Sequence, residues 1–182
     1  MLYNSGVSVL PAFVLALLCS LPLSAQDLMK SKASALSFFS DTPTYDIDAK
    51  TDKSSAVIKL STRQIAVKIP VAAFKFENKL MEEHFNDDYL ETVKYPLCTF
   101  EGTFDKAPDW TAANQSILAN GTLTMHGVSR KVMLSGSIVN KEGRHLLTGN
   151  MPVKLEDYGI KVPQLVFSKI AEVVDVKAEF EF

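Results

Sequence analysis

Apolar and polar residues alternate one by one over most of the chain after residue 60. Such alternation is typical of a β-strand with one face on a core and one face in water, because successive side chains point to opposite faces. The clearest runs span residues 65–71, 98–104, 119–125, 132–138, 147–155 and 174–182. Weaker alternation predicts strands near residues 33–40, 45–49 and 54–61. The pattern therefore predicts eight or nine short strands.

Turn-forming residues separate these runs. Residues 61–64 lie between two predicted strands, and residues 140–143 predict a slightly longer turn. His126 and Gly127 predict a tight turn, since glycine adopts positive φ without steric cost. Residues 105–114 predict a loop, whose Trp110 we expect to cover the core. Short connections of this kind join neighbouring antiparallel strands.

One stretch, residues 79–91, follows a different period. Met81, Phe85 and Tyr89 are spaced by four residues, which places them on one face of a helix. Asn78 is well suited to cap the start of this helix. We therefore predict one inserted helix at about residues 79–91.

These elements predict a mainly β fold: a single antiparallel β-barrel of about eight strands with one inserted helix. Closure into a barrel removes exposed sheet edges, which otherwise invite aggregation. A β-sandwich is the alternative. An eight-stranded barrel has room inside for side chains or for one small ligand.

The first 26 residues carry no charged side chain, and the first charge is Asp27. An apolar run over residues 7–23, followed by Ser24 and Ala25, predicts a secretory signal peptide of residues 1–25. The alternative is a membrane anchor that is not cleaved. We expect one mature domain of residues 26–182, located in the periplasm or secreted.

Composition narrows the class of partner. Nineteen Lys and Arg against 21 Asp and Glu give a net charge of −2, so no basic excess is present to neutralise nucleic-acid phosphates. Hydrophobic residues make up 47% of the chain, which indicates a folded domain and not a disordered one. We therefore expect no nucleic-acid partner.

Candidate catalytic chemistry is sparse. Cys98 is the single cysteine after residue 25, and its alternation with apolar neighbours predicts a buried, inert thiol. His84, His126 and His145 have no metal-ligand spacing, and His126 is expected to be a turn residue. No serine-hydrolase elbow and no phosphate-binding glycine loop is present. We expect no enzyme activity, no metal and no cofactor.

Four glycines, Gly102, Gly121, Gly136 and Gly149, fall on the apolar phase of the predicted strands. They indicate either an interior with missing side-chain volume or the bends that barrel curvature needs. Met81, Met125 and Met151 would add adaptable apolar lining to such an interior.

Three stretches together resemble the YceI-like family of polyisoprenoid-binding proteins. They are FKFENKLMEEHFNDDYLETVKYP (residues 74–96), LTMHGVSR (123–130) and LEDYGIKVPQLVFSKIAEVVDV (155–176). The resemblance implies a lipocalin-like barrel with a helix near its mouth. It also implies binding of a long isoprenoid chain, such as a quinone tail, inside the barrel. Members of the family are typically periplasmic or secreted.

We therefore expect an exported, non-enzymatic protein that holds an isoprenoid or another long-chain lipid; a transient contact with a membrane is compatible with this role. The ligand-binding residues are predicted to be the apolar residues facing inward from strands and helix: Val67, Phe74, Phe76, Met81, Phe85, Phe100, Leu123, Met125, Leu134, Met151, Val153 and Val176. The alternative is a solid-cored barrel that docks a protein partner. A hydrolase or an oxidoreductase is the least favoured class.

Overall fold

The computed structural model describes residues 27–40, 47–161 and 173–182. These residues form eleven β-strands and four short helical elements. The strands are β1 (Leu28–Lys30), β2 (Ala33–Ser40), β3 (Ile47–Thr51), β4 (Ser55–Lys59), β5 (Gln64–Pro70), β6 (Lys75–Phe76), β7 (Leu97–Phe104), β8 (Asn114–Met125), β9 (Val128–Lys141), β10 (Arg144–Lys154) and β11 (Val173–Glu181). The helical elements are η1 (Val71–Ala73), α1 (Lys79–His84), η2 (Phe85–Tyr89) and η3 (Leu155–Tyr158).

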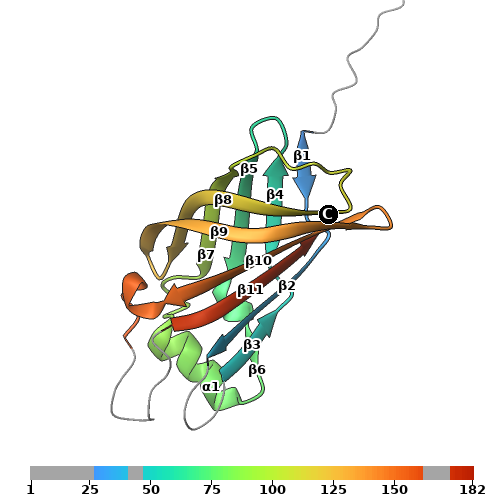
Figure 1. The fold of residues 1–182 in the computed structure, drawn as a ribbon. Coiled ribbons are helices and arrows are strands. Elements are labelled where there is room, and N and C mark those ends of the chain that lie inside the picture. The colour runs from blue at the N-terminus through green and yellow to red at the C-terminus, as the bar shows by residue number, and fades with distance from the viewer. Residues whose placement is uncertain (1–26, 41–46, 162–172) are drawn as a thin grey trace, which may run out of the picture.

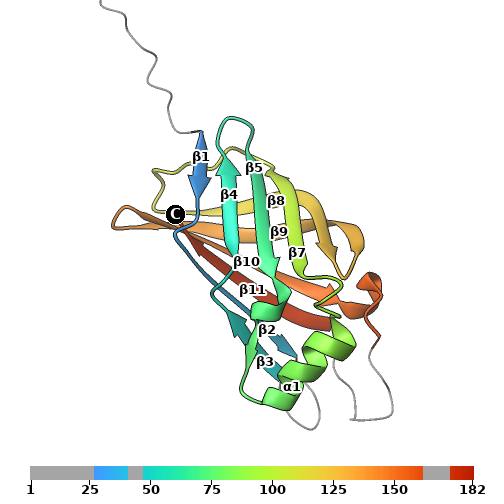
Figure 2. The ribbon, with the colours of Figure 1, turned by 180° about the vertical axis from the view of Figure 1, so that it is seen from behind.

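All strands belong to one antiparallel sheet in the order β1-β4-β5-β7-β8-β9-β10-β11-β2-β3-β6. The sheet curls strongly upon itself, and α1 lies across one end of it (Figures 1 and 2). The predicted antiparallel barrel with one inserted helix is confirmed, and one continuous curled sheet replaces the sandwich alternative. The strand count is eleven and not about eight, because β1 and β6 have only three and two residues, too few for alternation to reveal.

The two residues that connect β1 to β2, Ser31 and Lys32, join the two sides of the curled sheet. The backbone N–H of Ser31 donates to Ala56 of β4, while the N–H of Lys32 donates to Glu181 of β11, at 2.9 and 2.7 Å. One further hydrogen bond runs from the Ala56 N–H to the Ser31 hydroxyl at 2.9 Å. Two successive residues thus tie β4 and β11, which are far apart in the strand order, at this end of the barrel.

The predicted apolar phase faces the interior. Buried side chains recur at every second position of β5, β7 and β4, and the long strands β8 to β11 contribute the same phase. The largest fully buried side chains are Phe104, Ile58 and Ile138. Trp110 packs at the end of this core, with its ring 5.3 Å from His145 and 6.4 Å from Phe182. The prediction that Trp110 covers the core is therefore confirmed.

Two hairpins use two-residue turns in which both residues have positive φ. His126 and Gly127 have φ values of 51° and 75°, and Glu142 and Gly143 have 55° and 76°. This backbone matches the twist of antiparallel strands. The second turn is tighter than predicted, because Asn140 and Lys141 still belong to β9.

The helical segment begins where predicted, with α1, and ends at Tyr89, the last residue of η2, two residues before the predicted end. The Asn78 side chain accepts a hydrogen bond from the backbone N–H of Leu80 at 2.9 Å and caps α1. After His84 the chain widens into the π-helix η2, where the N–H of Leu90 donates to the carbonyl of Phe85. Glu91 then takes a left-handed conformation with φ of 43°, which stops the helix.

No helix among residues 27–40, 47–161 and 173–182 is long and apolar enough to span a bilayer. The predicted signal peptide lies outside the described residues. The same holds for residues 45–46 of one predicted strand and for residues 162–172 of the third family-like stretch.

Candidate ligand-binding site

The inward faces of the strands do not fill the barrel. They enclose a cavity of about 950 Å³, lined by residues of β2, β3, β5 to β11, α1 and η2. This volume lies near the upper end of the roughly 300–1,000 Å³ that small-molecule sites occupy. Phe39 and Leu80 belong to its lining and are 43% and 58% exposed, so the cavity opens to solvent beside α1.

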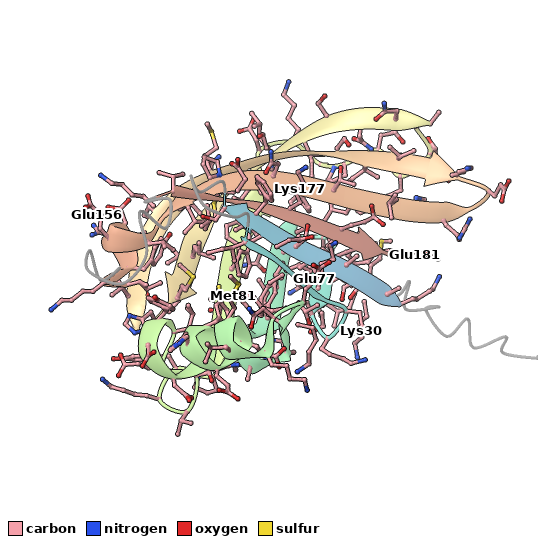
Figure 3. All side chains as sticks on the ribbon, turned by 90° about the horizontal axis from the view of Figure 1, so that it is seen from below. Lys30, Glu77, Met81, Glu156, Lys177 and Glu181 are labelled. Carbon is pink, nitrogen blue, oxygen red and sulfur yellow. The ribbon has the colours of Figure 1, made fainter. Side chains whose placement is uncertain are left out.

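All twelve predicted ligand-binding residues line this one cavity. Six strands contribute eight of them: Val67, Phe100, Leu123, Met125, Leu134, Met151, Val153 and Val176. The other four, Phe74, Phe76, Met81 and Phe85, come from the segment that runs from η1 to η2. Met81 lies between α1 and the strands (Figure 3). The geometry brings the whole predicted set together, and its role in binding stays a prediction.

Further residues line the cavity that were not among the twelve predicted ligand-binding residues. They include Leu36, Phe38 and Ser40 of β2, and Phe104, Ile117, Leu147 and Phe180 farther from α1. The strand β2 carried a weak signal because Phe39 is apolar on the outward phase and Ser40 is polar on the inward phase. Leu36, Phe38 and Ser40 nevertheless stand at every second position of β2, and this spacing could have indicated that they face the interior.

Four phenylalanines form one cluster on the cavity wall. Phe85 of η2 lies 5.5 Å from Phe38, 5.0 Å from Phe76 and 6.0 Å from Phe74, measured between ring centroids. Such aromatic pairs contribute about 0.5–1.5 kcal/mol each beyond their buried area. The cluster therefore attaches the helical segment to β2 and β6 through apolar contacts.

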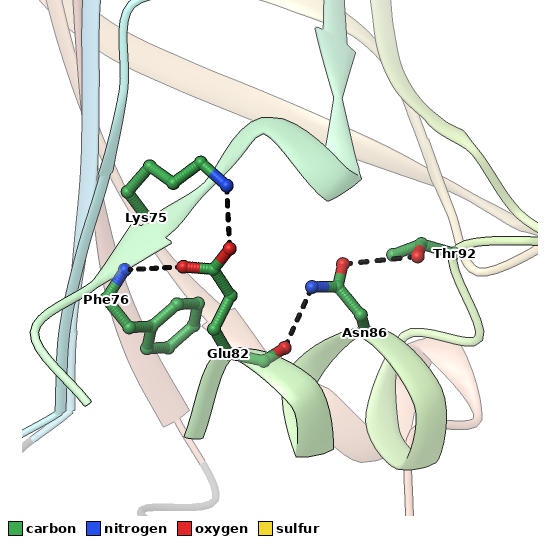
Figure 4. Close-up of polar contacts among 5 residues, drawn as sticks. All are labelled: Lys75, Phe76, Glu82, Asn86 and Thr92. Carbon is green, nitrogen blue, oxygen red and sulfur yellow. Dashed lines mark hydrogen bonds and ion pairs between the residues drawn. The ribbon is translucent and has the colours of Figure 1, made fainter. Parts of the chain in front are cut away.

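Polar contacts fix the same segment from its other side (Figure 4). Glu82 accepts a hydrogen bond from Lys75 Nζ at 2.6 Å and one from the backbone N–H of Phe76 at 3.3 Å. The Lys75 hydrogen bond, followed by the Phe76 hydrogen bond, lowers the pKa of the Glu82 carboxyl. Asn86 donates to the Glu82 carbonyl at 2.8 Å and pairs with Thr92 at 3.1 Å. α1 and η2 are thus held against β6 in one position beside the opening.

Most glycines on the apolar phase lie where a side chain would have no room. A Cβ on Gly121 would lie 2.4 Å from the Glu101 carbonyl oxygen, and one on Gly136 would lie 2.0 Å from that of Thr148. At Gly102 and Gly121 the Phe100 ring also occupies the space that a side chain would need. Gly149 differs, because its nearest neighbour would be the Ser135 carbonyl at 3.8 Å. Three of the four glycines therefore permit close approach of backbone or ring, and at Gly149 a side-chain methyl would fit with ordinary contacts.

Cys98 is buried and lines the cavity. Burial raises the pKa of its thiol to about 12. The prediction that Cys98 is buried is confirmed, and such a thiol stays protonated at neutral pH.

Charged and polar groups are few in the lining. Among the described lining residues there is no Lys or Arg, and the two carboxylates are Asp48 and Glu77. His84, which also lines the cavity, has its Nδ1 2.6 Å from Asp88. No group of three or more His, Cys, Asp or Glu residues in the described chain is arranged to hold a metal.

A second hollow of about 980 Å³ lies on the outer side of β8 to β11. Its lining includes Ser116, Ser137, Lys177 and Glu179, which belong to the outward phase of their strands. This hollow is lined by polar and charged residues together with apolar ones, whereas the interior cavity is lined mainly by Phe, Leu, Ile, Val and Met. The interior cavity is therefore the candidate site for an apolar ligand.

Fold and cavity together define a small antiparallel β-barrel with an apolar interior open beside a helix. The model of the YceI-like domain family matches residues 28–182. The chain belongs to the YceI-like domain family. A comparison with curated protein sequences gave no match.

Solved structures share this fold. BcnA of Burkholderia cenocepacia is similar with a TM-score of 0.69 and 19% identity, over 82% of this chain and 96% of that chain. A polyisoprenoid binding domain from Saccharophagus degradans, implicated in plant cell wall breakdown, has a TM-score of 0.69 and 18% identity, over 85% and 97%. The YCEI protein of Campylobacter jejuni has a TM-score of 0.58 and 21% identity, over 74% and 82%. At these identities the likeness establishes the shared fold.

Proposed function

We propose that this protein binds an isoprenoid or another long-chain lipid inside its barrel and acts as a non-enzymatic holder or carrier outside the cytoplasm. The observation that carries the proposal is the apolar cavity of about 950 Å³, lined by every residue predicted to bind such a ligand. The similar domain from Saccharophagus degradans is described as polyisoprenoid binding, which supports the same class of ligand.

The energetics of burial fit this role. Each buried CH₂ contributes about 0.8 kcal/mol, so one five-carbon isoprene unit contributes roughly 3–4 kcal/mol. A few units offset an association cost of about 4–15 kcal/mol. An apolar chain therefore needs few polar contacts to be held.

The test is mass spectrometry of organic extracts of the purified protein, followed by uptake of geranylgeraniol by the delipidated protein. We expect a long-chain lipid in the extract and saturable uptake near one molecule per chain. Protein refolded from denaturant without lipid is the control for carry-over. An extract without lipid, together with no uptake, would reject the proposal and favour the barrel as a protein-interaction module.

Export is a separate part of the proposal. The uncharged stretch before Asp27, which ends in Ser24 and Ala25, supports cleavage near Gln26. We expect the intact mass of exported protein to correspond to a chain that starts near Gln26. Exported protein that still carries Met1 would favour an uncleaved anchor.

A further inference from the structure

We propose that the cavity selects a lipid with an uncharged polar head, such as an alcohol or a carbonyl group, and holds this head beside Ser40 at the mouth with the tail pointing inward. This inference deepens the proposed lipid-binding function and rests on it. It depends on three observations: an unpartnered hydroxyl, the distribution of polar lining residues and the absence of cations from the described lining.

Ser40 is the unpartnered hydroxyl. It is the last residue of β2, pairs with Ile47 of β3 and shares the inward phase of Leu36 and Phe38. Its side chain lines the cavity and is 2% exposed, and its Oγ has no hydrogen-bond partner among the described residues. Buried polar groups in native proteins are nearly always hydrogen-bonded. A ligand oxygen that accepts from or donates to Ser40 would satisfy this requirement.

Ser40 also lies at the correct end of the cavity for a head group. One group of polar lining residues belongs to the ends of β2, β3 and β6, to α1 with its cap and to η2, beside the opening: Ser40, Asp48, Glu77, Asn78, His84 and Tyr89. The far end is lined by Phe104, Ile117, Ala119, Leu147 and Phe180, which have no polar side-chain atom. The other polar lining residues, Ser135, Thr148 and Asn150, stand beside the bare backbone of Gly136 and Gly149. A head at Ser40 therefore leaves the tail an apolar path inward.

The charged residues of the lining favour a neutral head group over an anionic one. Phosphates and carboxylates are bound in proteins by Arg, Lys or backbone N–H groups, and a buried charge without such a partner is strongly disfavoured. The described lining offers the carboxylates of Asp48 and Glu77 and no Lys or Arg. Lys50 of β3 and Lys75 of β6 are paired with Asp48 and Glu82. Neither these two lysines nor Lys79, the first residue of α1, lines the cavity. A phosphate head would meet like charge, whereas an alcohol would not.

The experiment measures equilibrium binding of three radiolabelled probes to the delipidated full chain: geranylgeraniol, geranylgeranyl phosphate and squalene, a hydrocarbon without a head. We expect geranylgeraniol to bind at least about 10-fold more tightly than the phosphate. Ser40→Ala should weaken geranylgeraniol binding by about 3- to 10-fold, the range of one hydrogen bond, and leave squalene binding unchanged. Ser40→Thr keeps the hydroxyl and should keep the preference for the alcohol.

Ser54→Ala is the matched control, because Ser54 Oγ is also buried and unpartnered but does not line the cavity. It should bind all three probes as the parent does. Equal binding of alcohol and phosphate, or equal loss of alcohol and squalene binding in Ser40→Ala, would overturn the head-group inference while lipid binding stands. Failure of the parent to bind any of the three probes would overturn the lipid function and this inference together.

Discussion

The Nε2 atom of His126 lies 2.9 Å from Oε2 of Glu91, although 35 residues separate them. The Nδ1 atom of the same ring lies 3.1 Å from the Tyr158 carbonyl oxygen, and the Tyr95 ring packs edge-on at 4.5 Å between centroids. The side chain is only 11% exposed. His126 is the turn residue that the sequence predicts, and it also joins the β8–β9 turn to the segment after η2 and to η3.

His126→Asn tests this junction. Asn adopts the left-handed backbone that the turn requires, so the change removes mainly the contacts to Glu91 and Tyr158. We expect a loss of about 1–3 kcal/mol in the free energy of unfolding, since buried polar partners are left unsatisfied. Denaturant unfolding measures it.

Glu142→Asn is the control, because Glu142 holds the same place in the exposed β9–β10 turn, with φ of 55°. It should change the free energy of unfolding by less than about 0.5 kcal/mol. Equal effects of the two substitutions would show that His126 acts through backbone conformation alone.

Cys98 gives a pH-dependent prediction. Its thiol pKa is raised from 9.0 to about 12 by burial, so between these values the unfolded chain releases a proton that the native chain keeps. The contribution of Cys98 to stability is therefore complete below pH 9 and decreases as pH rises toward 12, by up to about 1.4 kcal/mol per pH unit. We expect the stability difference between the parent and Cys98→Ala to shift in favour of the variant above pH 9.

Thiol labelling at neutral pH checks the same residue independently. A polar thiol reagent should modify unfolded protein quickly and native protein slowly. Rapid modification of the native protein would contradict burial and reopen a redox role for Cys98.

Leu123→Phe and Val153→Phe test whether the interior is hollow. Both residues line the cavity and are 5% and 4% exposed. In a close-packed core an added ring costs about 1–3 kcal/mol, whereas a ring that enters a cavity changes stability little or raises it. We expect the lipid-free variants to unfold with free energies within about 1 kcal/mol of the parent or above it, and to take up less lipid.

Unfolding of the delipidated variants, paired with lipid titration, measures both effects. Losses above about 1 kcal/mol at both positions, with no lipid bound by the parent, would establish a solid barrel.

The glycines provide a matched pair of substitutions. Gly149→Ala places its Cβ in ordinary contact with the Ser135 carbonyl oxygen, at 3.8 Å, and should stabilise the protein by about 0.4–1 kcal/mol, because it restricts the unfolded chain. Gly136→Ala forces its Cβ toward the Thr148 carbonyl and should destabilise by about 1–3 kcal/mol. Thermal or denaturant unfolding measures the change in the free energy of unfolding for each variant. Changes of the same sign and size in both variants would contradict the difference between the two positions.

The sequence predicted the phase of each strand more completely than the connections between strands. Alternation identified which face of β5 and β7 to β11 points inward, and the eight predicted ligand-binding residues on these strands therefore line one cavity. Asn78 and the spacing of Met81, Phe85 and Tyr89 likewise located the helix, because capping and helical period are local properties.

Non-local features could not be predicted in this way. Alternation does not say which strands are neighbours, so the crossing at Ser31 and Lys32 and the contact of His126 with Glu91 were not foreseen. Nor does the sequence show whether a glycine has room for a side chain, as Gly149 does, or lies against a neighbouring backbone carbonyl, as Gly136 does. Ser40 was not predicted as a lining residue because a polar residue at an apolar position indicates that the strand has ended, and not that the side chain faces a cavity.

Pairing of β2 with β11, which places Ala33 opposite Glu181, has a consequence for the order of folding. The strand β11 lies between β10 and β2 in the sheet, so it is the element that joins the N-terminal strands β2 and β3 to the hairpins β7 to β10. Until β11 is in place, β2 and β10 both expose an unpaired edge. The barrel therefore closes only when β11 joins them, and because this pairing brings together strands far apart in the sequence, we expect it to be a late step of folding.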